Sequence, residues 1–149
     1  MTLTITPEQN INENQTQELA VNSCGSNQLN PDLSLVIGKI NALPADWLDS
    51  GNDTIFVDSG QFPFPWIVRC FRDGDRFTPI GIKGRKKLKD LFIDKKIPRA
   101  VRKTIPIFLC RGEIFWVGGV QMAEETRITE SSAALLRLRL IPHTTSARH

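Results

Sequence analysis

The chain has 149 residues, of which 40% are hydrophobic and 23% charged, and its formal net charge is +3. This length suits one domain with a core of its own. The longest apolar stretches, Ile105–Cys110 and Ile114–Val120, are far shorter than the roughly 18 residues that a membrane span needs. The first residues have neither the basic segment nor the apolar run of a signal peptide. We therefore expect a cytoplasmic protein with no membrane partner.

The residues typical of metal sites and nucleophilic catalysis are scarce. The three cysteines have no C-x-x-C spacing, and the two histidines, His143 and His149, both lie near the C-terminal end. Neither histidine is placed to act as the base for Cys70 or Cys110, which end two apolar runs. We expect these cysteines to be small core residues, with no metal site and no catalytic residue in this chain.

The charges are distributed unevenly along the sequence. The first part, Met1–Val68, has one base and eight acids, whereas Arg69–Arg111 has fourteen bases and four acids. The basic block therefore carries +10 within a nearly neutral chain. Such a block indicates a surface for a polyanion, although on charge alone a solvated basic face is an equally good interpretation.

The first thirty residues are expected to be a disordered tail or linker. Glu8–Asn30 is rich in Asn and Gln and has no periodic apolar pattern, so it cannot bury enough surface to offset chain entropy. Residues 31–50 are expected to be helical, because Asn30-Pro31 looks like an N-cap with proline at the first helical position. Apolar residues then recur at helical spacing, at Leu33, Val36, Ile37 and Ile40.

Residues 51–142 are expected to form the main domain, followed by a polar tail at 143–149. Short β-rich runs alternate with turn signals, and the expected strands are Thr54–Val57, Trp66–Phe71, Ile105–Cys110, Glu113–Val117 and the alternating Leu136–Leu140. The fold class is therefore α+β: a small, mostly antiparallel sheet with a basic helical insertion, preceded by a helix and the disordered tail.

The basic insertion is the strongest functional signal. We expect a helix over Arg85–Lys95 with Leu88, Leu91 and Phe92 facing the core. Gly81 and Gly84 would place backbone N–H groups at its N-terminus, which favours a phosphate. The candidate nucleic-acid-binding side chains are Arg76, Lys83, Arg85, Lys86, Lys87, Lys89, Lys95, Lys96, Arg99, Arg102 and Lys103.

One segment carries a family resemblance. Within Phe71–Pro106, the strings Gly-Asp-Arg-Phe-x-Pro and Lys-Lys-Leu-Lys-Asp-Leu-Phe-Ile-Asp-x-Lys-Ile-Pro-Arg closely resemble the C-terminal domain of tRNA(Ile)-lysidine synthase. The likeness continues through Gly112–Val120 and covers about Ile55–Thr129, half of the chain. It implies a tRNA-binding domain in tRNA processing and modification, with isoleucine tRNA and its acceptor-stem region as the partner.

The resemblance also implies a division of labour. The family enzyme is a carbon–nitrogen ligase: ATP adenylates C2 of the wobble cytidine, and the lysine amine then displaces AMP to give lysidine. ATP and magnesium belong to a separate ATP-pyrophosphatase domain with a Ser-Gly-Gly-x-Asp-Ser loop, and this sequence contains no such loop. We therefore expect this chain to need no cofactor, to bind tRNA rather than catalyse, and to work with a catalytic domain in cis or in trans.

Three alternatives remain open from the residues. Gly81-Ile82-Lys83-Gly84 has the G-x-x-G form of a K-homology RNA module, which would be free-standing. The aromatic run Gln61–Trp66 is compatible with a protein-interaction module. A self-contained enzyme would rely on Asp73 and Asp75, which are better interpreted as turn residues with local ion pairs to Arg72 and Arg76.

Overall fold

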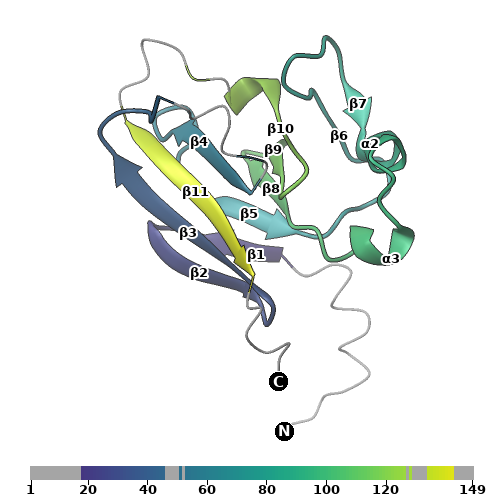
Figure 1. The fold of residues 1–149 in the computed structure, drawn as a ribbon, viewed down its shortest axis with the longest axis horizontal. Coiled ribbons are helices and arrows are strands. Elements are labelled where there is room, and N and C mark those ends of the chain that lie inside the picture. Colours follow the sequence, from purple (N-terminus) through teal and green to yellow (C-terminus); the bar gives the residue numbers. More distant parts are fainter. Residues whose placement is uncertain (1–17, 46–50, 52, 127, 129–133, 143–149) are drawn as a thin grey trace, which may run out of the picture.

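Two antiparallel sheets pack face to face, and the basic insertion lies on the other side of one of them (Figure 1). The computed structural model describes residues 18–45, 51, 53–126, 128 and 134–142. Every strand pair described is antiparallel. The expected α+β class with a mostly antiparallel sheet is confirmed. No helix among the described residues is long and apolar enough to span a membrane.

The five-stranded sheet is the middle layer. Its strands, in spatial order, are β1 (Glu18–Val21), β5 (Trp66–Arg69), β8 (Ile107–Cys110), β9 (Glu113–Val117) and β10 (Gln121–Met122). All four residues of β8 are buried, because Phe108 and Cys110 belong to one core while Ile107 and Leu109 belong to another. The sequence of a strand that is covered on both faces is a continuous apolar run.

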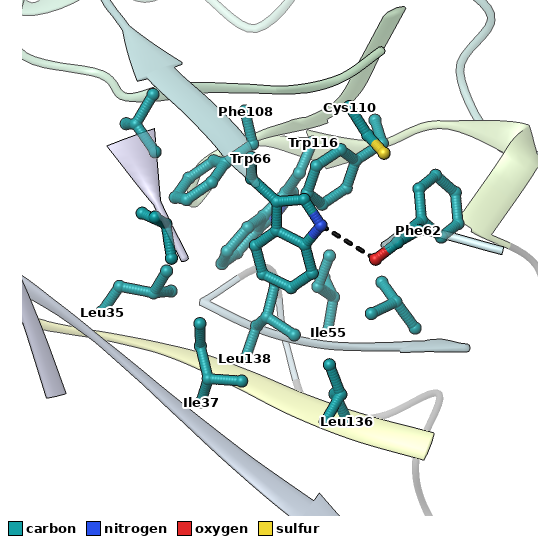
Figure 2. Packing of buried hydrophobic residues seen from close by; sticks show 14 of the residues in the cluster. Leu35, Ile37, Ile55, Phe62, Trp66, Phe108, Cys110, Trp116, Leu136 and Leu138 are labelled. Atoms are coloured by element: carbon teal, nitrogen blue, oxygen red, sulfur yellow. Dashed lines mark hydrogen bonds between the residues drawn. The ribbon is translucent and has the colours of Figure 1, made fainter. Parts of the chain in front are cut away.

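The four-stranded sheet closes the first of these cores, called the central core below. Its strands are β2 (Gly25–Asn30), β3 (Leu33–Ile40), β11 (Leu135–Pro142) and β4 (Thr54–Asp58). Figure 2 shows Leu35, Ile37 and Leu138 from this sheet facing the rings of Trp66 and Phe108. The indole Nε1–H of Trp66 donates to the carbonyl of Phe62 at 2.9 Å, so this buried polar group has a partner.

The helix expected over residues 31–50 is wrong. Leu33–Ile40 is strand β3, which pairs with β2 on one side and β11 on the other. The apolar residues of this segment fit both the helical period of 3.6 residues and the strand period of two residues. Pairing of β3 with a strand on each side, together with the burial of Leu35 and Ile37, selects the strand period. Asn30-Pro31 makes a strand turn: the Asp32 N–H donates to Asn30 Oδ1 at 2.8 Å, a typical Asn turn.

The expected disordered tail is also wrong for Glu18–Asn30. This segment forms β1 and β2, and Val21 of β1 is completely buried against the central core. Because β1, β2 and β3 belong to the same two sheets as the later strands, boundaries at residues 30 and 50 do not separate structural units. The rest of the expected tail (1–17), residues 46–50 of the expected helix and the tail at 143–149 lie outside the described residues.

The later expectations agree better with the structure. The strands expected at Thr54–Val57, Trp66–Phe71 and Leu136–Leu140 are confirmed as β4, β5 and β11, although β5 already ends at Arg69. The hairpin of β8 and β9 turns at Arg111 and Gly112, whose φ angles are 55° and 82°. Two positive φ angles are typical of a type I′ turn, which suits the twist of paired strands.

The basic insertion contains β6 (Arg76–Phe77), β7 (Lys86–Lys87), α2 (Leu88–Asp94) and α3 (Arg99–Arg102). Leu88, Leu91 and Phe92 of α2 are buried as expected, and they pack with Phe77 and the outer face of β8 in the second core. The expected helix start at Arg85 is wrong. Lys86 and Lys87 pair with Phe77 and Arg76 instead, so the ladder holds them extended and the helix begins at Leu88.

Candidate nucleic-acid interface

All eleven candidate cations lie on two connected segments at one side of the molecule. We call residues 76–87 the cationic arm: it comprises β6, its loop and β7, and carries Arg76, Lys83, Arg85, Lys86 and Lys87. We call residues 88–103 the helical segment, which comprises α2 and α3 and carries Lys89, Lys95, Lys96, Arg99, Arg102 and Lys103. Figure 1 shows both segments on the side of the five-stranded sheet that faces away from β3 and β11.

Three of these cations already have partners within the protein. Lys86 is half-buried and forms an ion pair with Asp94. Arg85 lies 3.7 Å from Glu113 and donates to the Arg76 carbonyl at 3.3 Å. Arg102 donates through Nε to the carbonyl of Ile97 at 3.0 Å and lies over the Phe92 ring. These three side chains are therefore less available to an external anion.

The other eight cations are exposed and unpaired. Within the part of the chain that the structure describes, the side chains of these eight residues form no ion pair and no hydrogen bond. They are Arg76, Lys83, Lys87, Lys89, Lys95, Lys96, Arg99 and Lys103. An exposed cation without a carboxylate nearby keeps its full attraction for a phosphate.

The glycines do not lie where the sequence places them. Gly81 and Gly84, with φ near +82° and +84°, belong to the loop between β6 and β7 and not to a helix N-terminus. The N–H of Gly81 donates to Glu124 Oε1 at 2.8 Å. A carboxylate thus occupies the donor that the sequence assigns to a phosphate, and the expected phosphate contact at Gly81 has no support. That at Gly84 stays a prediction.

The C-terminal end of α2 places a lysine in an unusual backbone conformation. Lys96 has φ 59°, in the left-handed region that glycine adopts most easily. The Ile97 N–H donates to the Phe92 carbonyl at 2.9 Å and the Lys96 N–H to the Ile93 carbonyl at 3.0 Å, which is the Schellman pattern. Ile97 then packs against the second core. Lys96 therefore occupies the position where helices favour glycine.

Asp75 has a different partner from the one expected. Its carboxylate is bound by Arg69 in β5, not by Arg76. The Arg72 N–H donates to Asp75 Oδ2 at 2.8 Å, while the Arg72 guanidinium pairs with Glu18 of β1. The charge count of the basic block includes Arg69, but a count gives no sign that this guanidinium is used internally.

The remaining candidate groups for catalysis or metal binding lie outside the cationic arm and the helical segment. Cys110 is buried, and this burial raises the pKa of its thiol, which disfavours the nucleophilic thiolate. Among the described residues, no group of three or more His, Cys, Asp or Glu side chains could hold a metal ion. The aromatic run Gln61–Trp66, considered as an alternative docking surface, contributes Phe62 and Trp66 to the central core (Figure 2).

Comparisons with known proteins agree with this topology. The family model described as "TilS substrate C-terminal domain" matches residues 67–140. A crystal structure of a TilS C-terminal domain superposes with a TM-score of 0.74 and 28% identity, covering 85% of this chain and 98% of that one. This chain belongs to the TilS C-terminal domain family.

The curated relatives carry the full name of the family. The tRNA(Ile)-lysidine synthase of Geobacter sulfurreducens is 37% identical over 124 residues, which is 83% of this chain and 26% of that protein. The enzyme of the same name from Clostridium tetani is 30% identical over 131 residues, 88% of this chain and 28% of that protein. The chain thus spans about a quarter of the length of these TilS relatives.

The match explains which part of the sequence carries the resemblance. The TilS C-terminal model begins in β5 and ends in β11, so it includes the cationic arm, the helical segment and the second core. The structure does not support the K-homology alternative. In this fold Gly81-Ile82-Lys83-Gly84 lies in the loop that joins two paired strands, whereas the K-homology loop is followed by a helix.

Proposed function

We propose that this chain is the tRNA-binding part of a tRNA(Ile)-lysidine synthase, and that the cationic arm and helical segment contact the RNA backbone. The observation that carries the proposal is the set of eight exposed cations, unpaired among the described residues, on one side of a TilS C-terminal domain. Isoleucine tRNA, through its acceptor-stem region, is the proposed RNA. Lysines and arginines that contact phosphates position the RNA without reading its bases, so sequence preference is expected to be weak.

ATP and magnesium are assigned to the catalytic ATP-pyrophosphatase domain, which acts in cis or in trans. The residues of this chain do not fit them. The sequence has no Ser-Gly-Gly-x-Asp-Ser loop, and the described carboxylates do not gather into a metal site. The proposed role of this domain is to hold the tRNA while the other domain performs the ligation, and a cytoplasmic location is part of the same proposal.

The salt dependence of tRNA binding tests the proposal. If four to six cations meet phosphates, log K should fall with log salt with a slope of about −3 to −5. That slope corresponds to a loss of affinity of about 60- to 1,000-fold between 50 and 200 mM salt. Fluorescence anisotropy with labelled tRNA measures it. A slope near zero, or no binding at low salt, would contradict the proposal.

Two matched variants identify which surface binds. Lys89→Gln on α2 should reduce the size of the slope by about 0.7–0.9, as expected for one lost phosphate contact. Lys39→Gln on β3 removes another exposed lysine, from the other sheet, and should leave the slope unchanged. Equal effects of the two variants would assign the binding to overall charge rather than to this surface.

A partner protein is the second candidate, because large apolar side chains are exposed among the same cations. Ile82, Ile93 and Val101 are 48%, 54% and 44% exposed. Such residues favour contact with a protein surface, for example that of the catalytic domain. Protein binding through them should depend weakly on salt, so the same titration separates the two candidates.

Replacing Lys96 with glycine should raise the stability of the fold and lower its affinity for tRNA. Lys96→Gly relieves the left-handed backbone and should raise the free energy of unfolding by about 0.5–1 kcal/mol. It should also weaken tRNA binding, because one exposed charge is lost. Thermal melting and anisotropy measure the two effects.

The adjacent lysine is the matched control for this experiment. Lys95 has an ordinary φ of −86°, so Lys95→Gly loses the same charge without relieving strain. It should lower both stability and affinity. If Lys96→Gly stabilised the fold and bound tRNA as tightly as the wild type, Lys96 would have no role in binding.

A further inference from the structure

One cation of the basic block is not available to any external ligand. The side chain of Arg69 in β5 is only 8% exposed. Its Nη1 and Nη2 donate to the two carboxylate oxygens of Asp75, each at 2.9 Å, and Nη1 also donates to the Cys70 carbonyl at 2.9 Å. This two-pronged geometry is specific to a guanidinium and fixes both direction and distance.

Asp75 joins both ends of the cationic arm. It directly precedes β6, and its carbonyl accepts the N–H of Leu88, the first residue of α2, at 2.9 Å. Its Oδ2 also accepts the Arg72 N–H. The entry to the arm, the exit from the arm and the middle sheet therefore meet at the pair of Arg69 and Asp75.

We propose that Arg69 and Asp75 are positioning residues for RNA binding, which hold the cationic arm in a fixed relation to the helical segment. The proposal rests on the tRNA-binding function proposed above. Phosphates along an RNA helix are regularly spaced, so two groups of cations reinforce each other only when their relative position is set. An arm that had to be ordered on binding would lose affinity to the entropy of that ordering.

The test uses a substitution that keeps the charge. Arg69→Lys retains one positive charge but cannot form the two-pronged contact with Asp75. If Arg69 acted only as a charge, the variant would bind tRNA like the wild type. We expect it instead to weaken binding by about threefold to tenfold at 50 mM salt, about the effect of losing one phosphate contact of the arm.

A double-mutant cycle separates positioning from general destabilisation. Lys87→Gln, in the arm, should weaken tRNA binding in the wild-type background and have little further effect in Arg69→Lys, because the arm is already misplaced. Lys95→Gln, in the helical segment, should weaken binding equally in both backgrounds. If Lys87→Gln has its full effect in Arg69→Lys, or if Arg69→Lys binds normally, the proposal is overturned.

Amide hydrogen exchange gives a readout that needs no RNA. The Leu88 and Arg72 amides should exchange faster in Arg69→Lys, while amides of β3 and β11 keep wild-type protection. Unchanged protection at Leu88 would overturn the positioning role. If Arg69→Lys does not fold, Asp75→Asn, which removes the charge and keeps the shape, takes its place. If the wild type does not bind tRNA, the proposed function is wrong, whereas the hydrogen-exchange result still tests whether Arg69 and Asp75 hold the arm.

Discussion

Leu88→Asp is expected to unfold the domain at room temperature. Leu88 is completely buried in the second core, at the point where α2 meets the Asp75 carbonyl. A carboxylate there would be buried without a cationic partner, which costs several kcal/mol. That cost is comparable to the total stability of a small domain, about 5–15 kcal/mol. Circular dichroism and thermal melting measure the loss of structure.

The neighbouring position provides the matched control. Lys89→Asp introduces the same side chain one residue later on the exposed face of α2. Its effect on stability should stay within about 1 kcal/mol, the helix-propensity cost of aspartate, whereas tRNA affinity should fall. Equal losses of melting temperature for the two variants would contradict the packing of α2. Lys86 is a poorer choice, because it is half-buried and paired with Asp94.

Mixed with ATP, lysine and isoleucine tRNA, the purified chain is expected to form no lysidine and to release no pyrophosphate. Adenylation needs donors that hold the ATP phosphates and groups that offset the charge of the transition state. The sequence offers no phosphate loop of the family kind, and two acids of the basic block lie beside competing bases: Asp75 is bound by Arg69 and Asp94 by Lys86.

The Geobacter sulfurreducens relative, a tRNA(Ile)-lysidine synthase of which this chain matches 26%, is a suitable positive control. Lysidine is detected in digested tRNA by mass spectrometry, and pyrophosphate by a coupled assay. Product formed by this chain alone, in a preparation free of host enzyme, would place catalytic groups within this domain and contradict the proposed division of labour.

Local patterns predicted several elements of this molecule well. The alternation of Leu136, Leu138 and Leu140 identified β11, and Arg111-Gly112 marked the hairpin turn. The spacing of Leu88, Leu91 and Phe92 gave the buried face of α2. These features depend on residues close together in the chain, so their periodicity and turn chemistry are visible without knowledge of the fold.

The eleven candidate cations could be selected from the sequence, because their positions along the chain already place them on two short segments; their role in RNA binding stays a prediction. Charge alone, however, does not distinguish available cations from those used internally. Lys86 and Arg102 are partly occupied, and Arg69 is buried. The difference arises from side chains brought together by folding, such as the Asp75 carboxylate that binds the Arg69 guanidinium.

The sequence by itself determined the α+β class, the basic insertion and the family, because each depends on local pattern or on a contiguous motif. Only the tertiary structure decided that Glu18–Asn30 and Leu33–Ile40 are strands. Strand β1 has only four residues and β2 is mostly polar, so neither carries a readable apolar period, and they are held by ladders to β5 and β3. The apolar spacing of β3 fits a helix and a strand equally well, and its pairing with the distant β11 selects the strand. Non-local hydrogen bonds and burial override weak local preference.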